Sequence, residues 1–89
     1  MKKIVWRITS VTDKNEVAVN SEAVKERMSK RYFMYCALEG RSAILTNVDN
    51  QREALKTSTV EELFLFEDSI RITTKNSVYW LRQSIEDVN

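Results

Sequence analysis

Residues 59–74 read TVEELFLFEDSIRITT, a pattern of one strand, a short polar connection and a second strand. Residues 59–66 are rich in β-branched and aromatic side chains, which favour a pleated strand. The polar residues 67–69 are typical of a tight connection, and residues 70–74 return to the strand pattern. The stretch therefore predicts two antiparallel strands joined as a β-hairpin.

Strand patterns recur on both sides of this hairpin. Residues 4–11 place apolar side chains on one face with a period of two, so they predict a strand. Residues 31–38 are apolar on both sides of the pleat, as in a central or doubly covered strand. Gly40 allows a sharp turn from there into a partner strand at 42–48. Residues 77–81 predict a further strand.

One helix is expected, near residues 21–29. Asn20 or Ser21 can cap its first turn, because a short polar side chain accepts a hydrogen bond from a free backbone N–H. Val24 and Met28 lie four residues apart, so they share one face of the helix. We expect that face to pack on the sheet.

Three segments have weaker patterns. Residues 17–19 predict at most a brief strand. Residues 49–56 are predicted to form a polar loop, because they are too few for an independent helix. Residues 83–89 are polar and are predicted to form a loose tail.

Together these elements predict an α+β fold: a small antiparallel β-sheet or partly open β-barrel of about five to six strands with one short α-helix. We expect residues 1–82 to form a single β-rich domain and residues 83–89 a polar C-terminal tail. The sequence has no proline, so edge strands need protection by charge or by pairing with a second copy. A homodimer through an edge strand is compatible with this pattern.

The composition excludes several classes of function. The chain has 89 residues, of which 43% are hydrophobic and 30% charged, as in a folded domain. It has no histidine and a single cysteine, Cys36, so zinc sites and Cys–His catalysis are excluded. Gly40 is the only glycine, which excludes Gly-rich phosphate-binding loops. We therefore expect a non-enzymatic protein without cofactors.

The expected location is the cytoplasm. No apolar stretch approaches the ~18 residues that a membrane helix needs, so we expect no membrane partner. The start Met1-Lys2-Lys3 leads into a short alternating segment rather than the apolar core of a signal peptide. One cysteine cannot form an intramolecular disulfide, and the apolar neighbours of Cys36 predict a buried thiol.

A basic segment leads into aromatic residues and predicts a nucleic-acid-binding surface. Its candidate residues are Lys25, Arg27, Lys30, Arg31 and Tyr32. On a helix the basic side chains would lie close enough to meet successive phosphates of RNA or single-stranded DNA, while a tyrosine stacks on a base. The alternative is that the basic residues only solvate the outer face of an amphipathic helix and the aromatics pack inward.

An acidic stretch follows in the second half of the chain. Its candidate residues are Glu61, Glu62, Glu67 and Asp68. With a net charge of only +1, the molecule is expected to carry opposite charged poles, and the acidic pole could imitate nucleic acid. The alternative is solvated loop charge. Neighbouring residues on a strand point to opposite faces, so the adjacent pair of glutamates does not predict a catalytic site.

Several aromatic side chains are expected to be buried from solvent by another part of the protein or by a partner. Phe64 and Phe66 share one face of their strand, and the neighbouring leucines occupy the other. One of these faces must be covered by the helix, a second layer or another subunit. Trp6 and Trp80 are expected to anchor the core or to lie at a partner interface.

Three C-terminal segments, 57–60, 67–72 and 74–79, resemble a pattern of small uncharacterised β-proteins of bacteriophages and bacteria. The chain is also poor in glycine, proline and histidine, and in this it resembles early proteins of large lytic phages. The resemblance implies a regulator or inhibitor that blocks a host macromolecule. We thus expect a host protein as partner, with RNA or single-stranded DNA as the alternative.

Overall fold

The computed structural model describes residues 1–88. In chain order the elements are β1 (Lys2–Thr12), α1 (Glu22–Met28), β2 (Tyr32–Cys36), β3 (Ser42–Asn47), β4 (Asn50–Leu65), β5 (Ser69–Thr74) and β6 (Val78–Asp87). No helix in this part of the chain has the length and apolar character needed to cross a membrane.

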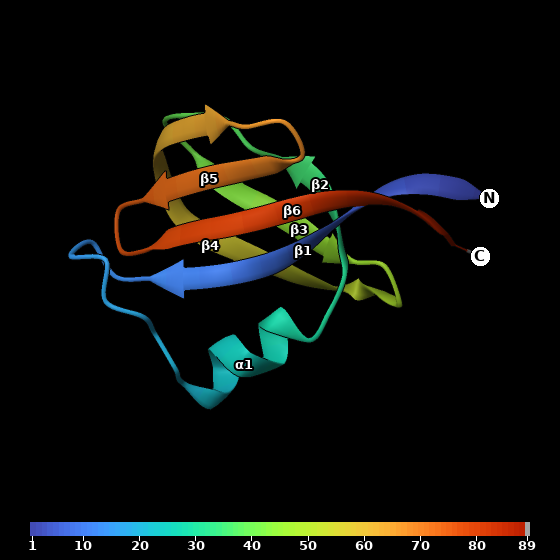
Figure 1. The fold of residues 1–89 in the computed structure, drawn as a ribbon, viewed down its shortest axis with the longest axis horizontal. Helices are drawn as coiled ribbons and strands as arrows, with labels where there is room; N and C mark the ends of the chain where they lie inside the picture. Colours follow the sequence, from blue (N-terminus) through green and yellow to red (C-terminus); the bar gives the residue numbers. More distant parts are fainter. Residues whose placement is uncertain (89) are drawn as a thin grey trace.

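The six strands form a closed antiparallel barrel. Each strand pairs with the next along the chain, and β6 returns to pair with β1. The first and last strands extend beyond the barrel as a two-stranded ribbon, with the two chain ends side by side (Figure 1). The predicted α+β class, six strands with one short helix, is confirmed, and so are the two predicted hairpins, β2–β3 and β4–β5. Every described strand has two neighbours in the barrel, but in the ribbon β1 and β6 pair only with each other, so the expected homodimer through an edge strand stays a prediction.

The thinnest seam of the barrel lies between β1 and β2. These strands share the single register pair Trp6 and Tyr32, whereas β1 follows β6 from Lys2 to Thr12. The helix α1 packs against β1 (Figure 1), and its Val24 belongs to the core cluster of the barrel. The helix therefore supplies apolar cover where strand pairing is sparse.

The core is built from alternate residues of the strands. Its buried members are Ile8, Val11, Val24, Tyr32, Ala43, Leu45, Leu55, Val60, Ile70, Ile72, Tyr79 and Leu81. On β3 and β5 the buried and half-buried side chains alternate strictly, as expected for strands with one face on a core. Removing these side chains from water is the main source of the barrel's stability.

The helix is formed by local signals that the sequence contains. The Ser21 hydroxyl accepts a hydrogen bond from the backbone N–H of Val24 at 3.2 Å, so Ser21 is the N-cap. A helix of seven residues is marginal by itself, and the burial of Val24 stabilises it against the barrel. The helix predicted near residues 21–29 is confirmed.

Two segments predicted to be irregular belong to strands. Residues 49–56 are not a loop, because β4 begins at Asn50 and pairs Leu55 with Leu45. Residues 83–88 are not a loose tail, because β6 continues to Asp87 and Val88 is 8% exposed. Pairing with a distant strand, rather than a strong local pattern, makes both segments strands.

Smaller expectations have mixed outcomes. Gly40 has a φ of +88° in the turn between β2 and β3, a conformation in which glycine has no steric cost. The short strand expected at residues 17–19 is reduced to one bridge between Thr12 and Ala18. Cys36, expected to be buried, is half-buried at the end of β2.

Candidate functional site

The predicted basic surface is largely neutralised by ion pairs. The helix ends at Met28, so Lys30 and Arg31 lie beyond it and do not continue a helical face. Lys30 forms ion pairs with Glu53 and, at 3.3 Å, with Glu26. Hydrogen bonding to Glu53 raises the pKa of Lys30, and the same contact lowers the pKa of Glu53. The charge of Lys30 is therefore committed within the molecule.

Arg31 is also held inside the fold. Its guanidinium lies 2.9 Å from the Asp49 carboxylate and 3.2 Å from that of Glu86, and it donates a hydrogen bond to the backbone carbonyl of Asp87. The hydrogen bond from Arg31 lowers the pKa of Asp49. Arg31 thus ties the start of β2 to the end of β6.

The other two basic residues differ from each other. Lys25 lies 3.9 Å from Glu22 on the same helix and is exposed. Arg27 is the one basic member of the predicted set that makes no ion pair within residues 1–88. The five residues therefore do not form the continuous positive surface that the sequence predicts.

Tyr32 cannot stack on a base, because it is a core residue. It is 1% exposed, whereas Tyr35 on the same strand is 76% exposed. Burial raises the pKa of the Tyr32 hydroxyl. The prediction of Tyr32 as a surface residue is wrong, because its register pair with Trp6 turns it toward the barrel interior.

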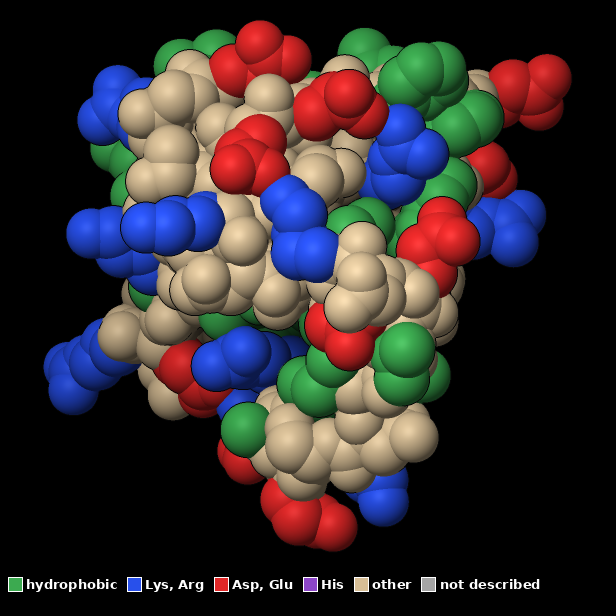
Figure 2. Space-filling model, turned by 90° about the vertical axis from the view of Figure 1, so that its left-hand side faces the viewer, with side chains coloured by type: hydrophobic (Ala, Val, Ile, Leu, Met, Phe, Trp, Pro, Cys, Tyr) green, Lys and Arg blue, Asp and Glu red, His purple; other side chains and the backbone are tan. Residues whose placement is uncertain are grey.

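The acidic residues do not form a separate pole. Glu61 pairs with Lys14, and Glu62 lies 2.8 Å from Arg71. Asp68 lies 2.9 Å from Arg82, and the hydrogen bond between them lowers the pKa of Asp68. Positive and negative side chains are interspersed over the face in Figure 2. Glu67 is the one member of the acidic set without an ion pair among residues 1–88.

The feature that the sequence analysis missed is an aromatic patch on the outer face of β4, β5 and β6. We define the aromatic patch as Phe64, Phe66, Arg71 and Trp80. Phe64, Arg71 and Trp80 are register partners across the three strands, so their side chains share one face. Phe66 continues the group, with ring centroids 4.8 Å from Phe64 and 5.4 Å from Trp80.

Arg71 is held in the middle of the aromatic patch. Its guanidinium carbon lies 5.1 Å from the ring centre of Phe64 and 5.7 Å from that of Trp80, within the range of cation–π attraction. Its terminal nitrogen contacts Glu62, while its buried Nε has no hydrogen-bond partner in the described residues. The arginine is therefore fixed before any partner arrives.

The rings themselves remain open to solvent. Phe64 is 48% exposed and Phe66 44% exposed, and Trp80 is half-buried. Hydrophobic side chains also gather at the upper right of the face in Figure 2. Phe64 and Phe66 alternate along the sequence and so share one face of a strand. This alternation is the sequence feature from which the patch could have been predicted. On the opposite face of β4, Leu63 packs on the core while Leu65 is 73% exposed, and the phenylalanine face is left uncovered.

Comparison with protein-family models, curated proteins and solved structures finds no match for this chain. The resemblance to small phage proteins therefore stays a prediction.

Proposed function

We propose that this protein is a non-enzymatic domain that binds another protein through the aromatic patch. The carrying observation is the group of half-exposed rings around the fixed Arg71. Aromatic and arginine side chains are the residue types that dominate binding energy at protein interfaces. Their order in the free domain lowers the entropic cost of association, because few rotamers have to be fixed on binding.

Charge around the patch favours a protein partner over a nucleic acid. Glu67 follows Phe66 directly and has no ion pair within residues 1–88, whereas Glu61, Glu62 and Asp68 are neutralised by Lys14, Arg71 and Arg82. A carboxylate repels phosphates, so Glu67 opposes the backbone of RNA or DNA at this end of the patch. A partner surface with an apolar centre and a lysine or arginine opposite Glu67 complements the patch in shape and charge.

A binding domain of this size acts by occupying a surface. The proposal follows the sequence-based expectation of a cytoplasmic regulator or inhibitor that blocks a host macromolecule. The partner would lose access to whatever else uses the covered surface, without any chemical step in this domain.

The test is a capture experiment with matched variants. The tagged wild-type protein, the double variant Phe64→Ser/Phe66→Ser and the control Arg27→Gln/Lys30→Gln are incubated with lysate of the cells that produce or are targeted by the protein. One protein retained by the wild type and the control, but lost by the double variant, supports the proposal. Equal recovery on all three baits contradicts it.

The alternative function, an RNA- or single-strand-binding module, has one supporting feature: exposed rings can also stack on bases. Its measurement is fluorescence anisotropy of labelled oligonucleotides at two salt concentrations. Oligonucleotide binding that is lost in Phe64→Ser/Phe66→Ser would favour the alternative over the protein-binding proposal.

A further inference from the structure

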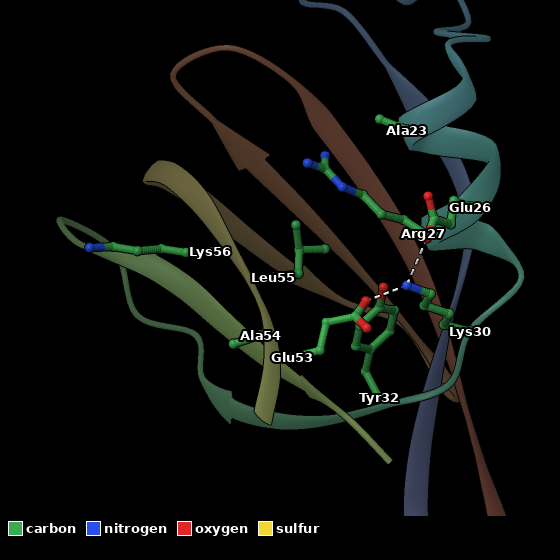
Figure 3. Close-up of a pocket in the computed structure, with 9 residues that line it drawn as sticks. All are labelled: Ala23, Glu26, Arg27, Lys30, Tyr32, Glu53, Ala54, Leu55 and Lys56. Carbon is green, nitrogen blue, oxygen red and sulfur yellow. Dashed lines mark hydrogen bonds and ion pairs between the residues drawn. The ribbon is translucent and has the colours of Figure 1, made fainter. Parts of the chain in front are cut away.

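A cleft lies between α1 and β4, away from the aromatic patch. Its volume is about 500 Å³, within the range of ~300–1,000 Å³ typical of small-molecule sites. Its lining comes from the helix, from Tyr32 at the start of β2, and from residues 53–56 of β4 (Figure 3). It sits beside the sparsely paired seam between β1 and β2, and the mouths of β-barrels are a common place for ligands.

The two ends of the cleft differ in charge. At one end Lys30 is bound by Glu26 and Glu53, with the Tyr32 side chain beneath them (Figure 3). This end is already satisfied by internal ion pairs. At the other end Arg27 extends from α1 across the cleft toward Leu55. It is partly buried and makes no ion pair within residues 1–88.

Two charged lining residues, Arg27 and Lys56, make no ion pair among residues 1–88. The side chain of Lys56 points away in Figure 3, so Arg27 supplies the unpaired positive charge that faces the opening. Leu55 and the small side chain of Ala23 provide an apolar surface next to this guanidinium, whereas Ala54 lies on the opposite face of β4 from Leu55. A planar guanidinium binds a carboxylate or phosphate through two parallel hydrogen bonds.

We propose that this cleft binds a small organic anion. The apolar body of the ligand, about the size of one ring, packs between Leu55 and Ala23, and its carboxylate or phosphate group accepts hydrogen bonds from Arg27. The ligand leaves the ion pairs of Lys30 intact. This site is independent of the protein-binding surface, since it shares no residue with the aromatic patch.

The probes are benzoate and phenyl phosphate, and benzyl alcohol is the uncharged control. Their binding is measured by ¹⁵N NMR titration of the full chain. Titration to about 10 mM covers the ~1 mM Kd expected for so small a ligand. We expect saturable shifts at the amides of Ala23, Arg27 and Leu55 with either anion. Arg27→Gln should weaken binding about tenfold, because a charged hydrogen bond is lost.

Two further variants make the test specific. Arg41 in the β2–β3 turn also makes no ion pair among the described residues, but it does not line the cleft. Arg41→Gln should therefore leave the affinity for either anion unchanged. Ala23→Phe fills the cleft from an exposed helix position and should abolish binding without unfolding the domain.

Several results would overturn the proposal. These are the absence of saturable shifts, equal binding of benzyl alcohol, and equal weakening by Arg27→Gln and Arg41→Gln. Shifts confined to the amides of the aromatic patch would also overturn it, while leaving the protein-binding function untouched.

Discussion

Replacing Tyr32 by alanine separates the structural role of this residue from the surface role that the sequence predicts. Tyr32 is 1% exposed and belongs to the core cluster, so its ring is removed from water completely. Truncating a buried aromatic residue to alanine costs about 3–5 kcal/mol, from lost burial and the cavity left behind. A domain of 89 residues is stable by about 4–13 kcal/mol, so this one change removes a large share of the total.

The assay is urea unfolding at 25 °C, followed by tryptophan fluorescence and circular dichroism. With an m-value near ~1.5 kcal/mol/M, the midpoint of Tyr32→Ala should fall by about 2–3 M urea. Tyr32→Phe keeps the ring and should change the free energy of unfolding by about 1 kcal/mol or less, because only one hydroxyl is lost.

Tyr35→Ala is the matched control on the same strand. Tyr35 is 76% exposed, and exposed substitutions usually change stability by about 0.5 kcal/mol or less. A Tyr32→Ala midpoint within about 0.5 M of the wild type, or a larger loss for Tyr35→Ala than for Tyr32→Ala, would refute the assignment of Tyr32 to the core.

Two predictions concern the C-terminal strand. Hydrogen bonds from Ser84 and Arg7 lower the pKa of Glu86 from 4.5 to about 2, so the stability that its ionised form contributes is present above about pH 4.5 and is lost as the pH falls toward 2. In thermal melts across this window, the Tm of Glu86→Gln should therefore fall less than that of the wild type, and parallel curves would contradict the prediction. Val88→Asp should lower the free energy of unfolding by about 2 kcal/mol or more, because a charge replaces a buried side chain; an unchanged urea midpoint would instead mean that residues 83–88 form the loose tail expected from the sequence.

The sequence predicts the fold class because its strongest signals are local. The capping residue Ser21, the turn glycine Gly40 and the alternating pattern of residues 70–74 act within a few residues of the chain, and all three have the predicted role. Residues 49–56 and 83–88 were missed because polar residues dominate both, and their few apolar residues do not alternate along the chain. Only a strand far along the chain decides that they are extended.

The candidate site is harder to predict because it depends on which face of each strand turns inward. Tyr32 and Tyr35 belong to one strand and lie on opposite sides of it, and nothing local says which one is buried. The pairing of Arg71 with Phe64 and Trp80 also joins three strands. The ion-pair partner of a charged residue cannot be predicted from its place in the sequence. Arg31 pairs with Glu86, for example, only because the tertiary structure brings the two together.

The closure of the barrel by its first and last strands limits how the chain can fold during synthesis. β1 is synthesised before the other five strands, yet its main partner, β6, is the last of the six, and Lys2 pairs with Asp87. Until then β1 has one register pair with β2, and its apolar residues Val5 and Ile8 lack their native cover. Pairing at such long sequence separation is slow, so the barrel cannot close until β6 has been synthesised.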